Sequence, residues 1–180
     1  MGLVHIYCGD GKGKTTAAVG LALRMAGNGR KVVLVRFLKH EDSGEVRTLR
    51  GIPGVEVLPC TKCFGFTWQM TGEEKQQAAE HCKIQFQKAW DRAVSLCESR
   101  ETDADVLLVL DEAAAALEHG LLQLSGVLDC VDHRPANLEI IFTGRRMPGE
   151  LLERADYVTE MRAVRHPYAR GIRARRGIEY

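Results

Sequence analysis

Residues 9–16 read GDGKGKTT and separate a short apolar run at residues 3–8 from a helical pattern at residues 15–26. The small and apolar residues of the helical pattern recur at spacings of three and four, which is typical of an amphipathic helix. A second apolar run follows at residues 31–38 and is apolar enough to be a strand buried on both faces. The order strand, glycine loop, helix and strand predicts a parallel β-α-β crossover.

The remainder of the chain continues this alternation. The longest helix is expected at residues 71–100, where Thr71 and Glu74 have the spacing of a capping box. Together with the glycine loop, the alternation predicts an α/β fold, P-loop NTPase-like (RecA-like), with a mainly parallel sheet flanked by helices in a single domain at residues 1–180. Additional strands are expected at residues 55–58, 106–110, 138–143 and 157–161, and additional helices at residues 113–119, 121–131 and 148–154.

The expected sheet also predicts where a ligand binds. Ligands of parallel sheets bind at the carboxyl ends of the strands. The loops that follow Cys8, Leu38, Leu110 and Thr143 are therefore expected to face the same edge of the sheet. A binding site at that edge would combine segments that lie far apart in the sequence.

The composition limits the classes of function. The chain has 180 residues, with 25 Lys and Arg against 24 Asp and Glu, so its formal net charge is +1. Such a balance argues against a general nucleic-acid-binding protein, which would carry a basic excess. Apolar residues make up 45% of the chain, and no apolar run approaches the roughly 18 residues that span a membrane. We expect a cytoplasmic protein with no nucleic-acid partner and no membrane partner.

The six cysteines favour reduced thiols over disulfides, because the chain is long and shows no secretory signal. Cys60 and Cys63 have the spacing of half a zinc signature, but no second pair follows at a similar spacing. His81 and Cys82 could complete a set of four ligands in space. A zinc site is therefore the less favoured alternative to plain free cysteines.

The glycine loop has the composition of an anion-binding site. The alternating glycines Gly9, Gly11 and Gly13 let the backbone bend so that its N–H groups converge on an anion. The helix that follows adds the positive end of its dipole. Lys14 supplies a full charge, and the hydroxyl of Thr15 can bind a Mg²⁺ ion that bridges phosphate oxygens. A glycine-rich turn that binds nothing is the alternative, which the lysines and the flanking strand and helix disfavour.

This loop is one residue shorter than the usual phosphate loop. The usual pattern has four residues between its first glycine and the Gly-Lys pair. Counted back from Gly13, that first glycine would be residue 8, but residue 8 is Cys8 and the available glycine is Gly9. A tighter loop need not hold a triphosphate in the usual register, which argues against ordinary γ-phosphoryl transfer.

Two acids, Asp111 and Glu112, directly follow the most apolar of the expected strands. In nucleotide sites, an acid at this place binds the metal ion directly or through water. A pair of helix-capping or solvated acids is the alternative and is common after strands. The phosphate loop in the same chain favours the metal-binding interpretation.

Three aromatic residues, Phe64, Phe66 and Trp68, lie close together in an expected loop. Alternation places Phe66 and Trp68 on one side, where they would suit a flat apolar ligand or stacking. The alternative is a loop folded back over an edge of the core with its rings buried.

Combined, these motifs resemble the ATP:corrinoid adenosyltransferases, the P-loop family that makes adenosylcobalamin. The resemblance follows the order of the family across nearly the whole chain. The matching segments are residues 9–18, 36–39, 44–45, 65–68, 110–112, 143–145, 166–168, 171–174 and 177–180.

The resemblance implies that ATP lies in the phosphate loop in reversed orientation. A cob(I)alamin-type nucleophile attacks the ribose 5′-carbon, and triphosphate leaves with its charge neutralised by Lys14. Because cobalt is the nucleophile, positioning and charge stabilisation do the catalysis and no protein base is needed. The nucleotide-binding residues carried over are Gly9, Asp10, Gly11, Lys12, Gly13, Lys14, Thr15, Thr16 and Arg145.

By the same resemblance, Thr15, Asp111 and Glu112 hold Mg²⁺ or Mn²⁺. Phe66 and Trp68 match aromatics that close the lower face of the corrinoid and displace its lower ligand, which leaves a four-coordinate Co(II) that is easier to reduce. The expected catalytic residues are thus Lys14, Phe66 and Trp68.

The resemblance also implies a place in adenosylcobalamin biosynthesis or salvage, a reducing flavoprotein as partner, and a homodimer. Two alternatives stay open from the sequence. One is a P-loop nucleoside kinase, and the other is a non-catalytic nucleotide-binding module.

Overall fold

The computed structural model describes residues 1–39, 43–60, 62, 64, 70–99 and 105–179. These residues contain one six-stranded sheet with the strand order β3-β2-β4-β5-β1-β6. Each pair of neighbouring strands runs parallel. The strands are β1 (Val4–Cys8), β2 (Lys31–Arg36), β3 (Val55–Val57), β4 (Val106–Asp111), β5 (Leu138–Thr143) and β6 (Tyr157–Glu160).

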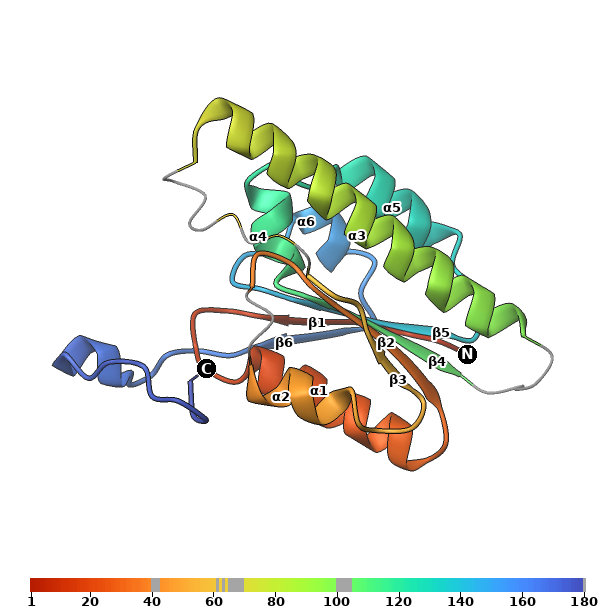
Figure 1. The fold of residues 1–180 in the computed structure, drawn as a ribbon, viewed down its shortest axis with the longest axis horizontal. Helices are drawn as coiled ribbons and strands as arrows, with labels where there is room; N and C mark the ends of the chain where they lie inside the picture. Colours follow the sequence, from red (N-terminus) through yellow and green to blue (C-terminus); the bar gives the residue numbers. More distant parts are fainter. Residues whose placement is uncertain (40–42, 61, 63, 65–69, 100–104, 180) are drawn as a thin grey trace.

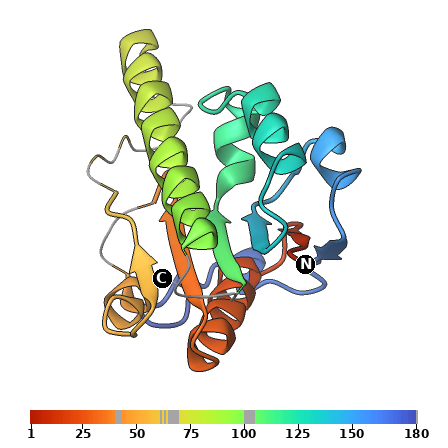
Figure 2. The same cartoon turned by 90° about the vertical axis from the view of Figure 1, so that its right-hand side faces the viewer.

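Helices cover both faces of this sheet (Figures 1 and 2). One face carries α1 (Lys14–Gly27) and α2 (Gly44–Leu49), and the other face carries the remaining helices. This arrangement confirms the α/β fold with helices on either side of a parallel sheet. The remaining helices are α3 (Gly72–Glu98), α4 (Ala113–Glu118), α5 (Leu124–Asp132) and α6 (Gly149–Leu152).

The central strand β4 is buried along its whole length. Its side chains alternate between two apolar clusters because successive residues of a strand point to opposite faces. Leu107 and Val109 pack with Ala18 and Ala22 of α1, whereas Leu108 and Leu110 belong to the cluster that includes α3. Burial on both faces explains why the sequence of this strand is a continuous apolar run.

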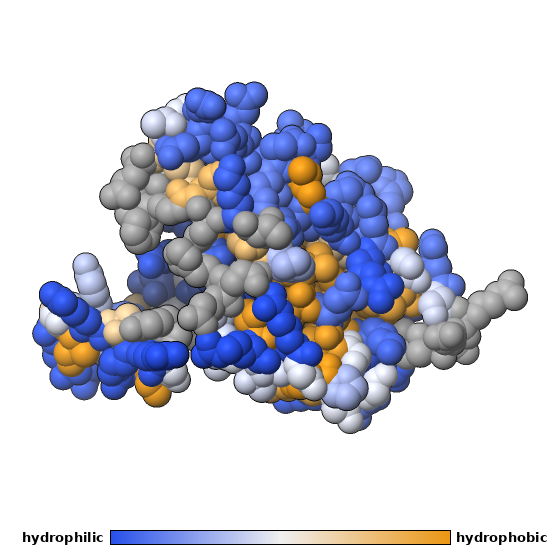
Figure 3. All heavy atoms as spheres, viewed as in Figure 1, coloured by the Kyte–Doolittle hydropathy of each residue, from blue (hydrophilic) through white to orange (hydrophobic). Residues whose placement is uncertain are grey.

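The long helix α3 is a single element, as the sequence predicts. Thr71 caps it through a capping box: its hydroxyl accepts from the Glu74 N–H at 3.2 Å, and its own N–H donates to the Glu74 carboxylate at 2.8 Å. The outward side of this helix is hydrophilic (Figure 3). The capping box therefore fixes where α3 begins, and the apolar face of α3 packs against the sheet.

Several bounds differ from the expected ones: the helix expected at residues 121–131 is α5 (Leu124–Asp132), and the helix expected at residues 148–154 is the shorter α6 (Gly149–Leu152). Two further differences have a clear physical reason. The strand expected at residues 31–38 ends at Arg36, because Leu38 adopts a left-handed conformation with φ 56° and turns the chain out of the sheet. The helix α2 was not expected, since only Val46 and Leu49 are buried in it and two apolar residues make too short a pattern.

The strand β6 lies at an edge of the sheet, and its side chains are exposed. The chain then continues past the phosphate loop into an exposed C-terminal segment that contains a short 3₁₀ helix, η2 (Pro167–Arg170). This segment lies to one side of the sheet (Figure 1) and is mostly hydrophilic (Figure 3). Of the helices described, none has the length and apolar character needed to cross a membrane.

Candidate nucleotide and metal site

The phosphate loop lies between β1 and α1 and packs against the chain that leaves β6. Gly9 and Gly13 have φ of 100° and 118°, a conformation that side chains rarely adopt. The Gly9 N–H donates to the Arg145 carbonyl at 2.9 Å, and the Gly11 N–H donates to the Met161 carbonyl at 2.7 Å. A Cβ at Gly9 or Gly11 would collide with the Met161 carbonyl. Glycine is thus required here both for the turn and for the close approach of a second chain segment.

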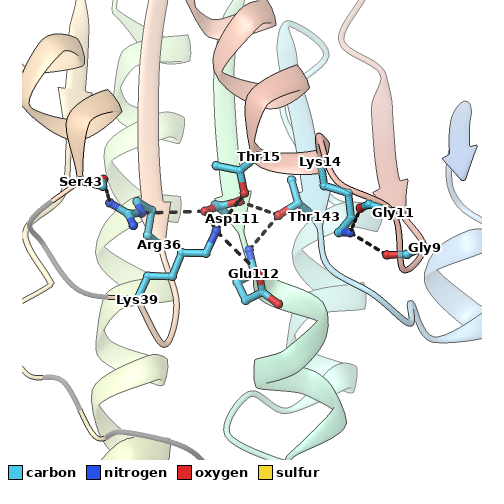
Figure 4. A network of polar contacts seen from close by, with 10 residues as sticks. All are labelled: Gly9, Gly11, Lys14, Thr15, Arg36, Lys39, Ser43, Asp111, Glu112 and Thr143. Carbon is cyan, nitrogen blue, oxygen red and sulfur yellow. Dashed lines mark hydrogen bonds and ion pairs between the residues drawn. The ribbon is translucent and has the colours of Figure 1, made fainter. Parts of the chain in front are cut away.

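Lys14 is the first residue of α1, and its side chain folds back over the loop. Its Nζ donates to the Gly9 and Gly11 carbonyls, each at 2.7 Å (Figure 4). Burial lowers the pKa of Lys14, while the nearby carboxylates of Glu112 and Asp10 oppose that shift. The ammonium is therefore held directly above the loop expected to bind the triphosphate.

Asp111 ends β4 and is the most buried charged group of the site, with 1% of the residue exposed. Its Oδ1 accepts from the Thr15 hydroxyl at 2.8 Å and from the Thr143 hydroxyl at 2.7 Å, and its Oδ2 accepts from Lys39 Nζ at 2.7 Å (Figure 4). Burial alone would raise the pKa of this carboxyl. The ammonium of Lys39 and the two hydroxyl donors outweigh burial and hold the pKa of Asp111 below its usual value. Asp111 is therefore ionised at neutral pH.

Glu112 follows in a left-handed conformation, with φ 60°. Its backbone N–H donates to the Thr143 hydroxyl at 2.8 Å, the same hydroxyl that donates to Asp111. Its carboxylate is 28% exposed and lies 3.7 Å from Lys39 Nζ. A non-glycine residue in this conformation costs on the order of 1–3 kcal/mol, and such strain concentrates at functional sites. Here it turns the second acid toward the phosphate loop.

The expected convergence of four loops at one edge of the sheet is confirmed. Thr15 follows β1, Lys39 follows β2, Asp111 ends β4 and Thr143 ends β5, and hydrogen bonds join all four side chains (Figure 4). The register of the sheet brings the strand ends level, because Arg36 pairs with Asp111 across β2 and β4. The parallel topology and the strand register together bring these distant segments to one place.

Two basic residues of the site were not assigned a role from the sequence. Lys39 Nζ contacts Thr15 Oγ1 at 2.9 Å in addition to its bond with Asp111. Arg36 Nε lies 3.9 Å from Asp111 Oδ2, and Arg36 Nη1 donates to the Ser43 hydroxyl at 2.6 Å. Both lie in the segment 36–39 that resembles the family, and the signal that could have given them a role is their place at the carboxyl end of β2, beside an acid that ends a buried strand.

The other sequence-predicted residues are placed as follows. Lys12 and Thr16 are exposed on the loop and on the first turn of α1. Asp10 accepts from the Ala163 N–H at 3.1 Å, so its carboxylate ties the loop to the chain after β6. Arg145 meets the loop through its backbone carbonyl, and its residue is exposed. Phe66 and Trp68 lie outside the described residues.

The alternative zinc site is not brought together by the residues that the structure describes. Within them, no three His, Cys, Asp or Glu side chains form a group that could hold a metal ion. Cys63 lies outside the described residues. Burial, and to a smaller extent the neighbouring Cys60, raises the pKa of Cys82 to about 12.

The donor set at the sheet edge fits a hard divalent cation. Thr15, Asp111 and Glu112 offer one hydroxyl and two carboxylates, and oxygen ligands of this kind are those that Mg²⁺ prefers. Phosphate oxygens and water would complete the coordination. The three residues therefore fit Mg²⁺ or Mn²⁺ in chemistry, although Lys39 Nζ stands among them.

A comparison with known families decides between the functions left open by the sequence. Residues 1–180 match the family model described as ATP:corrinoid adenosyltransferase BtuR/CobO/CobP. The chain belongs to this family. It is 38% identical to the corrinoid adenosyltransferase of Pseudomonas aeruginosa over 181 residues, which cover 99% of this chain and 84% of the relative. It is 35% identical to that of Escherichia coli over 179 residues, which cover 99% and 86%.

Membership in this family of adenosyltransferases confirms the resemblance drawn from the motifs and, with it, transfer of an adenosyl group from ATP to a corrinoid. Among solved structures, the ATPases 2 and 3 of EssC from Geobacillus thermodenitrificans match with a TM-score of 0.51 and 14% identity. The match covers 99% of this chain and 36% of that one. At this identity the likeness shows the fold alone, and it agrees with the expected α/β fold of a parallel sheet flanked by helices.

Proposed function

We propose that this adenosyltransferase joins the 5′-deoxyadenosyl group of ATP to the Co(I) centre of a corrinoid and releases triphosphate, in adenosylcobalamin biosynthesis or salvage. The observation that carries the proposal is the shortened loop with Lys14 above it, in a chain that matches the family over its whole length. A cobalt–carbon bond forms with the electron pair of Co(I), and the bond between C5′ and the triphosphate oxygen breaks. No proton changes place in this step, so no general base is required.

The loop residues and Lys14 supply the charge stabilisation. The N–H groups at the start of α1 would face an anion bound there, whereas the N–H groups of Gly9 and Gly11 already donate to the carbonyls of Arg145 and Met161. Lys14 Nζ bonds two loop carbonyls at 2.7 Å, and in the proposed reaction it transfers these contacts to the leaving triphosphate. Arg145 and Lys12 are exposed beside the loop and add positive charge for the same anion.

A divalent ion is proposed at Thr15, Asp111 and Glu112, where Mg²⁺ or Mn²⁺ would neutralise charge on the triphosphate. The two acids have different roles. Asp111 is held by the hydroxyls of Thr15 and Thr143 and orients them, while Glu112 is the more exposed carboxylate and the better placed for direct ligation. Thr143 couples the two acids by bonding Asp111 and the Glu112 backbone.

For Phe66 and Trp68, the proposal is contact with the lower face of the corrinoid. Phe64, the one aromatic of this group that the structure describes, packs against the core, and its ring lies 5.7 Å from that of His81 on α3, so the support for Phe66 and Trp68 is the resemblance to the family. We also propose a reducing flavoprotein as electron donor, a homodimer, one domain at residues 1–180, and the cytoplasm as the place where ATP and a reductant meet. Their support is the resemblance to the family.

The test of the reaction is direct. The protein is incubated with ATP, Mg²⁺ and a corrinoid that has been chemically reduced to Co(I). We expect a light-sensitive adenosylcorrinoid and one triphosphate released per adenosyl group transferred. Formation of ADP on an added nucleoside, without adenosylcorrinoid, would instead support a nucleoside kinase.

The aromatic residues predict a second, selective effect. In Phe66→Ala or Trp68→Ala, turnover should fall at least about tenfold when Co(II) must be reduced on the enzyme, because the lower ligand is no longer displaced. With pre-reduced Co(I), turnover should stay close to that of the parent protein. Phe86→Leu on α3 serves as a control for loss of an aromatic ring elsewhere. Equal losses from Co(II) and Co(I) would contradict the lower-face role.

A further inference from the structure

Lys39 stands where the divalent ion is proposed to bind. Its Nζ lies 2.7 Å from Asp111 Oδ2, 2.9 Å from Thr15 Oγ1 and 3.7 Å from Glu112 Oε2 (Figure 4). These are the same three residues that offer oxygen ligands for the metal. An ion bound to them would sit about 2.1 Å from each ligating oxygen, which leaves no room for an ammonium among them.

The backbone aims Lys39 at this place. Leu38 adopts a left-handed conformation with φ 56°, which is strained for a residue with a side chain. The residue before it, Phe37, is buried, and its N–H donates to the Asp111 carbonyl at 2.9 Å. The segment is thus fixed to the end of β4 on one side of Lys39 and turned sharply toward the acids.

Arg36 is a second cation near the same carboxylate oxygen of Asp111 as Lys39. The side chain of Arg36 is 9% exposed, and its Nε lies 3.9 Å from Asp111 Oδ2. Within the described part of the chain, this Nε has no hydrogen-bond partner. If Lys39 moved away, Asp111 would still have Arg36 as a buried cationic neighbour. The negative charge of Asp111 would therefore remain compensated.

We propose that Lys39 is a positioning residue that competes with the divalent ion for Asp111, Thr15 and Glu112, so that the ion binds tightly only together with the triphosphate. The inference rests on the proposed function only in taking these three residues as the metal site. The triphosphate brings negative charge that the metal ion and the displaced ammonium can share. Lys39 thereby couples metal binding to nucleotide binding.

The experiment measures Mn²⁺ binding to the full chain without nucleotide or corrinoid, by the electron paramagnetic resonance signal of free Mn²⁺. In Lys39→Met, the Kd for Mn²⁺ should fall at least about tenfold, equivalent to about 1.4 kcal/mol, because the competing ammonium is gone. A residue with a merely structural role would weaken metal binding when replaced, so the sign of the change identifies competition. Lys39→Gln is a second neutral variant and should show the same gain in Mn²⁺ affinity. It keeps the test possible if Lys39→Met does not fold.

Three controls sharpen this test. Lys39→Arg keeps the positive charge and should not gain affinity. Lys75→Met removes the same charge from an exposed residue on the first turn of α3 and should leave the Kd unchanged. Adding Glu112→Gln to Lys39→Met should abolish the gain, since it removes a proposed ligand.

An unchanged or weaker Mn²⁺ affinity in both neutral variants would overturn the proposal, as would an equal gain in Lys75→Met. The outcome is separable from that of the proposed function. Failure to form an adenosylcorrinoid would count against the reaction, whereas the Mn²⁺ titration contains no substrate and reports only on Lys39 and the acids.

Discussion

Acids lie both where the parallel strands begin, here called the amino edge of the sheet, and where they end, here called the carboxyl edge. The acids at the two edges accept hydrogen bonds from different kinds of donor. At the edge where β1 and β5 begin, Glu139 accepts from the Leu3 backbone N–H at 2.7 Å and also contacts His5. At the opposite edge, Asp111 accepts only from side chains in the described structure, those of Thr15, Thr143 and Lys39. Backbone donors are fixed by the fold, whereas hydroxyl and ammonium groups of side chains can rotate and exchange partners.

This difference separates a structural acid from a functional one. Asp156 repeats the pattern of Glu139, because its carboxylate accepts from the Val4 N–H at 2.8 Å and fixes the start of β1. Such bonds fix the start of β1 to the rest of the sheet, and they involve no ligand. At the carboxyl edge, two of the three donors to Asp111 are the phosphate-loop Thr15 and Lys39, both of which a nucleotide and its metal ion can recruit.

Removing Lys14 should produce the largest loss. In Lys14→Ala, the rate of adenosyl transfer to a pre-reduced Co(I) corrinoid should fall on the order of 10³-fold, because the departing triphosphate loses its closest cation. Single-turnover formation of adenosylcorrinoid measures this rate. Lys75→Ala is the matched control, since it removes an equal charge from the surface of α3.

A loss smaller than about tenfold in Lys14→Ala would break the assignment of charge stabilisation to the carboxyl edge. Stability is the second readout, because the Lys14 ammonium bonds only carbonyls of its own loop in the described structure. The midpoint of urea unfolding should therefore move little while activity collapses.

Asp111→Asn should come next, with about a 10²-fold loss of activity and a lower free energy of unfolding. The amide would place a second donor against the donor Lys39 Nζ, so the pair is lost while the shape is kept. The same substitution at the other edge, Asp156→Asn, should leave adenosyl transfer within about twofold. Equal activity loss in both variants would contradict the distinction between the edges.

The dependence of stability on acid pH gives a second test of Asp111. Its pKa lies below the ordinary value of 3.8 in the folded protein, so its carboxylate stabilises the fold above about pH 4, and this stabilisation is lost as the pH falls through the lowered pKa. Asp111→Asn should therefore flatten the acid side of the stability profile measured by urea unfolding between pH 3 and pH 6. An unchanged slope would mean that the pKa of Asp111 is the same in the folded and the unfolded state, and would contradict the lowered pKa.

Much of the site could be read from the sequence because its segments carry strong patterns. The glycine spacing of residues 9–13 and the apolar run that precedes Asp111 each require one local structure, and parallel topology then brings them together. Phosphate binding explains only in part why residues 9 and 11 are glycines, because the Met161 carbonyl also approaches both of them closely. That approach involves a partner about 150 residues away, which local patterns do not report.

Lys39 and Arg36 escaped assignment for a related reason. A basic residue after a strand is ordinary in composition, and its meaning depends on the positive φ of Leu38 and on the register that sets Arg36 against Asp111. Neither the backbone conformation of one leucine nor the pairing of two strands is encoded in a short motif. The same limit applies to α2, whose two buried residues, Val46 and Leu49, fall below the length at which periodicity is recognisable.

The smallest effect is expected at the amino edge. In Glu139→Gln, the fold should lose about 1 kcal/mol of unfolding free energy, because the amide still accepts from the Leu3 N–H but loses its charge toward His5. Adenosyl transfer should stay within about twofold of the parent protein. Urea unfolding and the Co(I) assay, run on one preparation, measure both quantities. A tenfold loss of activity with unchanged stability would place an acid of the amino edge in the reaction, and the kind of donor would no longer tell a structural carboxylate from a functional one.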